Sequence, residues 1–203
     1  MTETVEVEGG DARLAEAIAH HPGAQVRFAA DASSDVARAI GIRGDCWGVQ
    51  QPVTLDVLRL GPHERAVNMV VLGAPPDRLR WQHRGRRCRV EVDGRLLHDG
   101  NATTVVVANG EYLRGCDVVP RGHPGDGRFE VQVYAVPSSQ RRRLRTRVRT
   151  GTHVPHPGIH SAQGAHVVVQ WGRSVRREVD GVRYPAVREF EATLGAGELT
   201  LVP

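Results

Sequence analysis

The spacing of the hydrophobic residues divides the chain near residue 45. Residues 4–10 and 26–30 alternate apolar with polar positions, which is typical of short strands. Between these stretches, apolar residues at helical spacing occupy Leu14, Ala15, Ile18 and Ala19. Asp11 stands where a helix cap is expected, and either serine of residues 33–34 can cap a second helix over residues 35–40. The pattern predicts a β-α-β-α fragment of an α/β domain.

After residue 45 the pattern changes to that of an antiparallel all-β protein. Eight short, β-branched or alternating stretches predict strands at residues 53–60, 65–72, 86–92, 103–108, 129–136, 166–171, 176–179 and 198–202. Asp-Gly and Asn-Gly pairs, which favour tight turns, separate several of them. One helix is predicted over residues 138–150, with serines in front as caps. Many short strands at this spacing favour a β-sandwich.

The stretch from residue 103 to residue 133 contains the longest connection between two predicted strands. Residues 103–108 are apolar and β-branched, as in a strand that is buried on both faces. Residues 129–133 alternate, which predicts a half-buried strand. A connection of roughly twenty residues is long for a compact domain, so we expect it to carry function or to bind an ion.

Composition excludes several classes of protein. The 203 residues carry a net charge of +4 and only 4% aromatic residues, and no nucleic-acid-binding module is recognisable, so we expect no nucleic-acid partner. All 27 basic residues are arginine, which excludes a P-loop lysine or a Schiff base. Cys46, Cys88 and Cys116 are widely spaced, as in a reduced cytoplasmic protein. No signal peptide or membrane span is predicted.

Gly9, Gly10 and Asp11 form the first chemical motif. Glycines between a strand and a helix N-terminus let a phosphate group approach the backbone N–H groups, and the helix dipole favours the anion. The alternative interpretation is a plain turn.

The long connection is also where the chain resembles a known family. The pattern Val-Val-Val-x-Asn-Gly begins at residue 105, and Gly-x-x-Val-x-Pro-x-Gly-x-Pro-x-Asp-Gly-x-Phe-x-Val begins at residue 115. These patterns resemble the bacterial diacylglycerol-kinase-like lipid kinases, which are relatives of sphingosine kinases and, more distantly, of NAD kinases. The resemblance implies a C-terminal β-sandwich over residues 46–203, preceded by a small remnant of the α/β nucleotide-binding domain over residues 1–45.

The resemblance implies a site for ATP and magnesium near the N-terminus. The family's Gly-Thr-x-Asn-Asp-hydrophobic-Ala-Arg-x-Leu-Gly-Ile motif matches this chain at Asp35, Ala37, Arg38, Gly41 and Ile42. Asp31, Ala32 and Ser34 replace its glycine, threonine and asparagine. The implied nucleotide-binding residues are therefore Gly9, Gly10, Asp11, Ser34 and Asp35. The alternative is a capped structural helix.

Two further positions carry implied roles. In the family an Asp-Asp-Gly sequence in the long connection holds magnesium, and here only Asp126 remains, since Gly125 replaces the first aspartate. An acidic base of the family lies in an Asp-Gly-Glu sequence, which corresponds to Asp180 followed by Gly181 and Val182. For both Asp126 and Asp180 the alternative is the ordinary chemistry of an Asp-Gly turn.

Residues 141–149, which contain six arginines, predict either contact with an anionic membrane surface or a solvated helix face. The chain begins almost at the Gly-Gly-Asp motif, whereas family members carry further α/β structure before it. We therefore expect a catalytically impaired relative that binds a lipid or a protein, as a homo-oligomer through an exposed sheet edge, in the cytoplasm or at the membrane periphery. The rival expectation is an active or split ATP-dependent lipid kinase, with a partner chain that supplies the missing domain.

Overall fold

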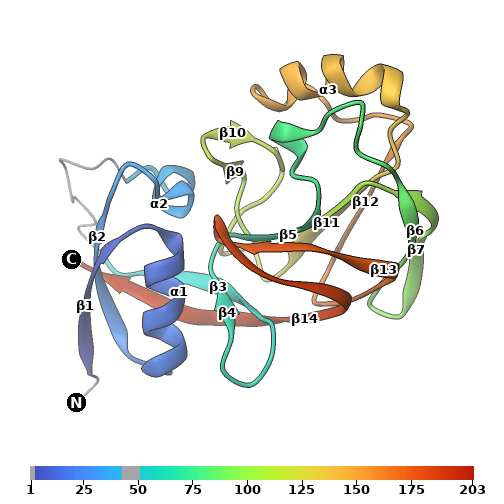
Figure 1. Cartoon of the computed structure of the whole chain (residues 1–203). Coiled ribbons are helices and arrows are strands. Elements are labelled where there is room, and N and C mark those ends of the chain that lie inside the picture. Colours follow the sequence, from blue (N-terminus) through green and yellow to red (C-terminus); the bar gives the residue numbers. More distant parts are fainter. Residues whose placement is uncertain (1–2, 43–50) are drawn as a thin grey trace.

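The computed structural model describes residues 3–42 and 51–203 (Figure 1). Cys46 lies outside these residues. The chain begins with β1 (Thr4–Gly9), α1 (Asp11–His20), β2 (Gln25–Ala30) and α2 (Asp35–Ala39). β1 and β2 are parallel neighbours, with Val7 opposite Phe28. The predicted β-α-β-α order is confirmed.

The remaining described chain is mostly β, as predicted, with one helix of more than one turn. Its strands are β3 (Val53–Arg59), β4 (Arg65–Ala66), β5 (Met69–Gly73), β6 (Arg86–Val92), β7 (Arg95–Ala102), β8 (Thr104–Ala108), β9 (Tyr112–Leu113), β10 (Cys116–Asp117), β11 (Phe129–Tyr134), β12 (Ile159–Gly164), β13 (His166–Val179) and β14 (Val182–Val202). Its helical segments are η1 (Pro76–Arg78), η2 (Ser138–Gln140) and α3 (Arg141–Val148).

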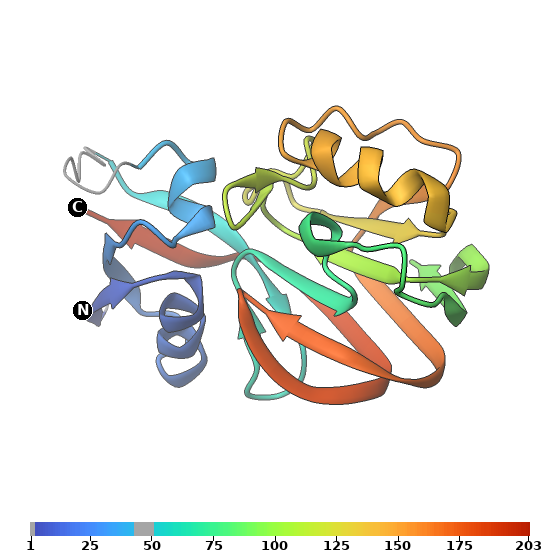
Figure 2. The same cartoon turned by 45° about the horizontal axis from the view of Figure 1, so that its top comes forward.

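The long strand β14 joins the N-terminal unit to the sandwich. One sheet runs in the order β1-β2-β14-β13-β5-β8-β11-β12. Near its end, β14 lies between two partners, because Thr200 is opposite Gln25 of β2 in parallel and opposite Thr54 of β3 in antiparallel orientation. Figures 1 and 2 show β14 crossing from the sandwich to the N-terminal unit. One sheet therefore contains strands from both sides of the predicted boundary, and the division into 1–45 and 46–203 stays a prediction.

Three buried apolar clusters hold these layers together. The first fills the sandwich and includes Val70, Val105, Val131, Trp171 and Phe190. The second lies under α1 and α2 and includes Leu14, Phe28, Leu55, Leu199 and Leu201. The third lies under α3 and includes Val71, Val106, Tyr134, Leu144 and Val148. Because β3 and β14 supply residues to the second cluster, the N-terminal unit shares its core with the strands that follow it.

The central strands are covered on both faces. In β8, Val105 and Val107 belong to the first cluster, whereas Val106 and Ala108 belong to the third, which confirms the prediction for residues 103–108. The prediction that residues 129–133 form a half-buried strand is wrong, since all six residues of β11 are buried. The third cluster, packed under α3, buries the face of β11 that carries its polar residues.

Several strand boundaries differ from the predictions. Residues 166–171 and 176–179 belong to one strand, β13, whose pairing with β14 changes register between Gln170 and Val175. The strands β7 and β12 and residues 182–197 of β14 were not predicted. Their sequences lack apolar runs, and pairing with neighbouring strands defines them. The Asp-Gly pairs at residues 93–94 and 180–181 form the turns of the hairpins β6-β7 and β13-β14, as predicted.

Two predicted helix caps are wrong and one is confirmed. Asp11 is the first residue of α1, and the cap residue is Gly10. No serine side chain caps η2, whose cap residue is Pro137. Ser34 does cap α2, because its Oγ accepts the backbone N–H of Ala37 at 3.1 Å. Within residues 3–42 and 51–203, no helix is long and apolar enough to cross a membrane.

Candidate functional site

The carboxylate of Asp11 joins the two N-terminal motifs. It accepts the hydroxyl of Ser34 at 2.6 Å and the backbone N–H groups of Asp35 at 3.2 Å and Val36 at 3.3 Å. These donors surround the N-terminus of α2, where an anion is favoured. Burial is the main reason why the pKa of Asp11 rises to about 6, and the hydrogen bonds from Ser34 and Val36 oppose that rise. Asp11, Ser34 and Asp35 thus lie together, but Asp11 and Ser34 bond to each other.

The backbone of Gly9 and Gly10 faces an anionic side chain. Asp31 accepts the hydroxyl of Ser33 at 2.6 Å and the N–H of Ser33 at 2.7 Å, and these two bonds lower the pKa of Asp31. A Cβ placed on Gly10 would lie 2.7 Å from Ser33 Oγ and 3.7 Å from Asp31 Oδ1. Where glycines would admit a phosphate, this chain presents a hydroxyl and a charged carboxylate, which repels phosphate in Coulomb terms.

Asp35 ties α2 to the turn between β9 and β10. Its carboxylate accepts the N–H of Gly115 at 2.8 Å and also the N–H of Arg114. The side chain is buried, and its nearest guanidinium is that of Arg38, with Nε 3.8 Å from Oδ1. Both carboxylate oxygens of this predicted nucleotide-binding residue are therefore used inside the protein.

Asp180 occupies the turn between β13 and β14, with a positive φ of 47°. Its buried carboxylate accepts three consecutive backbone N–H groups, from Val67 at 2.8 Å, Asn68 at 3.0 Å and Met69 at 2.9 Å. Burial and then the charge of Asp11 raise the pKa of Asp180 to about 7, against the effect of the three hydrogen bonds. The charge of Asp11, in the predicted nucleotide-binding cluster, therefore influences the pKa of Asp180, the predicted base.

Two asparagines extend this polar cluster. Asn109 donates its side-chain amide to the backbone oxygens of Asp56 at 2.6 Å and Val67 at 3.0 Å. Asn68 donates to the backbone oxygen of Tyr112 at 3.0 Å. The side-chain oxygens of both asparagines are buried and have no hydrogen-bond partner in the part of the chain that the structure describes. Each asparagine stands beside a valine-rich run in the sequence, Asn68 before one and Asn109 after another. Nothing in the neighbouring sequence indicates that these residues lie near Asp180.

The surroundings of Asp126 do not fit magnesium. Its Oδ1 accepts the backbone N–H of Arg128 at 3.2 Å, and its Oδ2 lies 3.7 Å from the guanidinium of the same residue. Within residues 3–42 and 51–203, no three His, Cys, Asp or Glu side chains gather in a way that could hold a metal ion. The nearby Asp56 uses its two oxygens for the N–H groups of Gly127 and Gly197, both at 2.8 Å.

Arg114 forms an ion-pair network that the sequence did not indicate. Its guanidinium donates to both oxygens of Asp77, at 2.7 and 3.0 Å, and also to Glu178. Asp77, Arg114 and Glu178 come from three separate segments, so no motif joins them. The network fixes the β9-β10 turn against the end of β13, next to Asp180.

The arginines in and just after helix α3 include one buried residue and several exposed residues. Arg141 is buried, and its guanidinium donates to the backbone oxygens of Val136, Arg80 and Trp81 at 3.0, 3.4 and 3.3 Å. Arg142, Arg143, Arg147 and Arg149 are exposed. The contact of this run with a membrane surface stays a prediction.

Comparison with known proteins identifies the family and the fold. Residues 78–195 match the family described as the YegS C-terminal NAD kinase beta sandwich-like domain. No curated protein sequence matches the chain. A diacylglycerol kinase from Bacillus anthracis str. Sterne superposes with a TM-score of 0.79 at 16% identity, over 98% of this chain and 76% of that one.

Two more distant structures share the fold. An NAD kinase from Archaeoglobus fulgidus, solved in complex with ATP, gives a TM-score of 0.56 at 10% identity, over 99% of this chain and 78% of that one. Yeast NADH kinase, solved with NADH, gives 0.54 at 13% identity, over 99% of this chain and 61% of that one. At these identities the likeness concerns the fold alone.

Proposed function

The chain belongs to the family of YegS C-terminal NAD kinase beta sandwich-like domains, and we propose that within this family it is a lipid-binding module that does not transfer phosphoryl groups by itself. The diacylglycerol-kinase-like fold supports the lipid part of this proposal. The chemistry of the N-terminal motifs supports the proposal that phosphoryl transfer has been lost.

The arrangement of Asp31 and Ser33 against Gly10 carries the proposal. Phosphoryl transfer depends on positioning and on electrostatic stabilisation of a polyphosphate. Here the glycine backbone faces the oxygen of Ser33 and the charged carboxylate of Asp31, whose pKa lies below its ordinary value. Among residues 3–42 and 51–203, no set of carboxylates around Asp126 suits the magnesium that would offset such a charge.

The second candidate function is an active or split ATP-dependent lipid kinase, and the state of Asp180 favours it. A general base works best when its pKa lies near the working pH, and the pKa of Asp180 is about 7. In this alternative Asp180 accepts the proton of the lipid hydroxyl, and a partner chain supplies the remaining wall of the nucleotide site. One structural neighbour, the NAD kinase from Archaeoglobus fulgidus, was solved with ATP, so the fold is compatible with nucleotide binding.

Calorimetric titration with Mg-ATP, with and without short-chain diacylglycerol, separates the two functions. For the wild-type chain we expect no binding heat and no thermal shift. The variant Asp31→Gly removes the carboxylate that faces the glycines and serves as the comparison. If the wild type binds Mg-ATP at micromolar concentration and phosphorylates the lipid, the proposed loss of transfer is wrong, and Asp180→Asn then tests the base.

A further inference from the structure

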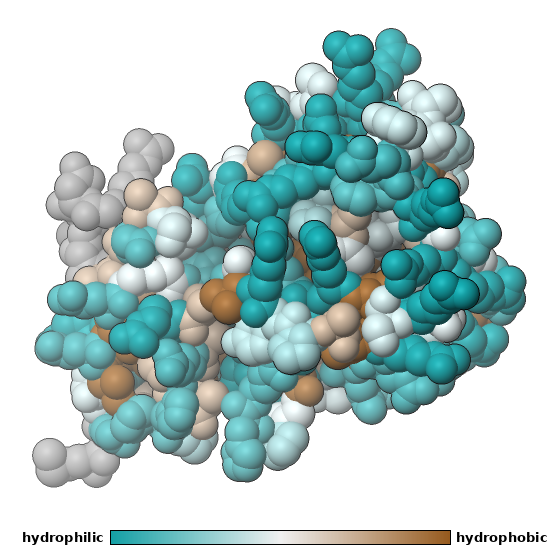
Figure 3. Space-filling view, in the orientation of Figure 1, coloured by the Kyte–Doolittle hydropathy of each residue, from teal (hydrophilic) through white to brown (hydrophobic). Residues whose placement is uncertain are grey.

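An arginine-lined pocket opens on the sandwich, outside the motif cluster around Asp11 and Asp180. Its volume is about 670 Å³. The stretch from the end of η1 to the start of β6 contributes Arg78, Arg80, Arg84 and Arg86, and the β13-β14 hairpin contributes Arg176, Arg177 and Arg183. Among the described residues of the lining, the only acidic one is Glu178, which Arg114 already neutralises. In Figure 3, hydrophilic side chains gather over this part of the front face, around exposed apolar atoms.

Most of these arginines have no partner in the described parts of the chain. The exceptions are Arg78, which lies 3.6 Å from Asp77, Arg177, which pairs with Glu64 at 3.0 Å, and Arg86, which donates to the backbone oxygen of Ser174 at 2.7 Å. In contrast, four lining guanidinium groups make no ion pair or hydrogen bond with any residue in the described parts of the chain: Arg80, Arg84, Arg176 and Arg183. Guanidinium groups that converge without carboxylates form a site for an anion, and they match phosphate oxygens in bidentate geometry.

A neighbouring histidine and the wall of the pocket also suit an anionic ligand. Burial and then the charges of Arg141, Arg80 and Arg176 lower the pKa of His83, which lines the pocket. Trp171 also lines it, and this side chain is only 3% exposed. Its indole Nε1 is a buried donor with no hydrogen-bond partner among residues 3–42 and 51–203. A buried donor without an acceptor is costly, so the wall contains a group that a ligand oxygen or a water drawn in with it would satisfy.

We propose that this pocket binds a phosphate group of a phosphomonoester, presented either by a lipid headgroup or by a soluble phosphate compound. The inference rests on the proposed lipid-binding function and names the chemistry that such a lipid would carry. It places the binding residues on the β13-β14 hairpin and the segment before β6, away from the glycine motif.

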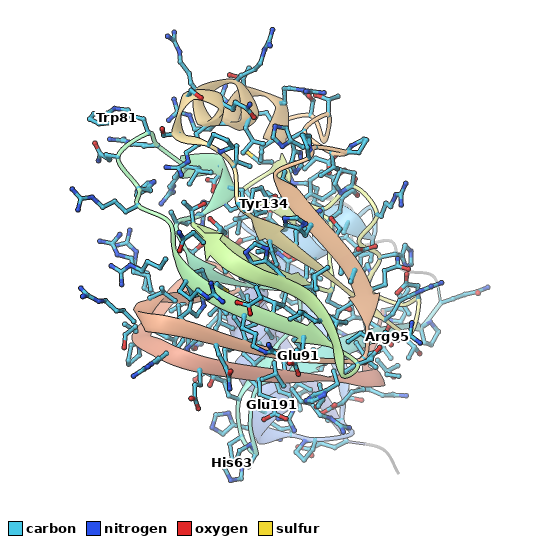
Figure 4. All side chains as sticks on the ribbon, turned by 90° about the vertical axis from the view of Figure 1, so that its right-hand side faces the viewer. His63, Trp81, Glu91, Arg95, Tyr134 and Glu191 are labelled. Atoms are coloured by element: carbon cyan, nitrogen blue, oxygen red, sulfur yellow. The ribbon has the colours of Figure 1, made fainter. Side chains whose placement is uncertain are left out.

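Trp81 favours a lipid headgroup as the source of that phosphate. Its side chain is 76% exposed, on the turn between the pocket residues Arg80 and Gln82. Figure 4 shows Trp81 projecting from the outer side of this loop. The buried guanidinium of Arg141 holds the turn by its backbone oxygens. An indole ring held beside arginines matches the interface of a bilayer, where tryptophan is enriched and cations meet anionic lipid.

Vesicle sedimentation and calorimetry with the full chain test the proposal. The vesicles are phosphatidylcholine mixed with phosphatidic acid, phosphatidylcholine mixed with oleic acid as an anionic control without a phosphomonoester, and phosphatidylcholine alone. Arg176→Gln and Arg183→Gln change exposed side chains without partners, so both variants should fold. Arg95→Gln makes the same charge change at an exposed, unpaired position on the β6-β7 hairpin, far from Trp81 in Figure 4.

We expect the wild type to prefer vesicles that contain phosphatidic acid. Arg176→Gln and Arg183→Gln should each weaken this binding by about fivefold, and Arg95→Gln should leave it unchanged. Equal loss in all three variants, or equal binding to oleic acid vesicles, would mean attraction to general negative charge and would overturn the pocket assignment. The lipid-binding module would survive that result, whereas a wild type that binds no vesicle would overturn the module itself.

The source of the phosphate is decided by a second pair of measurements. Trp81→Ala should weaken binding to phosphatidic acid vesicles and leave calorimetric binding of glycerol 3-phosphate unchanged if a headgroup is the ligand. A soluble phosphate compound is the ligand if two results are found together. Trp81→Ala changes neither vesicle binding nor glycerol 3-phosphate binding, and Arg176→Gln and Arg183→Gln reduce the binding of glycerol 3-phosphate. Absence of binding to both phosphatidic acid vesicles and glycerol 3-phosphate refutes the pocket.

Discussion

Asp180 and Met69 exchange two hydrogen bonds, one in each direction. The backbone N–H of Asp180 donates to the carbonyl oxygen of Met69 at 2.9 Å, and the carboxylate of Asp180 accepts the N–H of Met69 at the same distance. The turn between β13 and β14 is thereby locked onto the start of β5. Asp180, to which the family resemblance assigns proton transfer, therefore also links two segments that lie 111 residues apart in the sequence.

Replacing Asp180 with Asn should destabilise the fold in addition to any effect on chemistry. The amide oxygen can accept from at most two of the three N–H groups, and the amide nitrogen would face a donor. A buried N–H left without an acceptor costs about 1–3 kcal/mol, and we expect a loss of that size in the free energy of unfolding. Urea denaturation measures it, with Asp126→Asn as an exposed control that should change stability by less than about 0.5 kcal/mol. Equal midpoints for both variants would show that the three hydrogen bonds add nothing.

Replacing Asp11 with Asn should lower the pKa of Asp180. After burial, the charge of Asp11 is the largest influence that raises the pKa of Asp180 above its ordinary value of 3.8. Asparagine keeps an oxygen for the N–H groups at the start of α2 while it removes the charge. Carbon-detected NMR titration of the Asp180 carboxyl group reads the change directly. An unshifted titration would mean that burial alone sets this pKa.

The two carboxyl groups should also make stability depend on pH. The folded chain keeps their protons up to about pH 6 for Asp11 and pH 7 for Asp180, whereas the unfolded chain releases them near pH 3.8. Their contribution is therefore fully present below about pH 4 and is lost as the pH rises through 6 and 7. Between pH 4 and 7, the free energy of unfolding of Asp11→Asn should fall less steeply than that of the wild type, and a parallel fall would contradict the assignment.

Replacing Gly73 with Ala should be strongly destabilising. Gly73 has a φ of +94°, and a Cβ there would clash with the carbonyl oxygen of Thr103. Gly94 is a matched control, since its φ is +73° but nothing lies within 4 Å of a Cβ placed on it. We expect a loss of about 1–2 kcal/mol for Gly94→Ala from the backbone conformation alone, and at least about 3 kcal/mol for Gly73→Ala. Thermal and urea denaturation compare the two, and equal losses would exclude the steric contribution.

Replacing Arg114 with Lys should weaken the join between β9, η1 and β13. An ammonium group cannot reproduce the two bonds to Asp77 together with the bond to Glu178. We expect a loss of about 1–3 kcal/mol in the free energy of unfolding. Arg128→Lys is the control, because Arg128 is exposed and lies 3.7 Å from Asp126. If Arg114→Lys and this control lose the same free energy of unfolding, the network contributes no more stability than an exposed ion pair does.

The sequence predicts the features that depend on neighbouring residues. The Asp-Gly pairs predict both hairpin turns, because Asp93 and Asp180 with the glycines that follow them adopt the positive φ angles of a tight two-residue turn. The alternation of Val105, Val106 and Val107 between two clusters follows from a run that is apolar at every position. The clustering of Asp11, Ser34 and Asp35 agrees with their place in the motifs.

The features that depend on distant partners could not be predicted. The donors to the Asp180 carboxylate lie 111 to 113 residues away in the chain. In a chain without lysine, arginines are spread along the whole sequence, so nothing local distinguishes Arg176 and Arg183, which line the pocket, from Arg95, which does not. The contact of Ser33 with Gly10 depends on how the chain turns after β2, which neither motif specifies.

The course of β14 has a consequence for the order in which the protein can fold. Thr200 and Leu201 lie between β2 and β3, so the sheet of the N-terminal unit gains its middle strand only after the segment that follows β3 has been synthesised. Until then Leu55 and Val26 lack their neighbours Leu199 and Leu201 in the sheet. Contacts between residues so far apart in the sequence slow folding, and they leave apolar surface exposed in early intermediates, which makes these intermediates prone to aggregation. Loss of residues 199–202 should therefore leave the apolar side chains of β2 and β3 exposed and prone to aggregation.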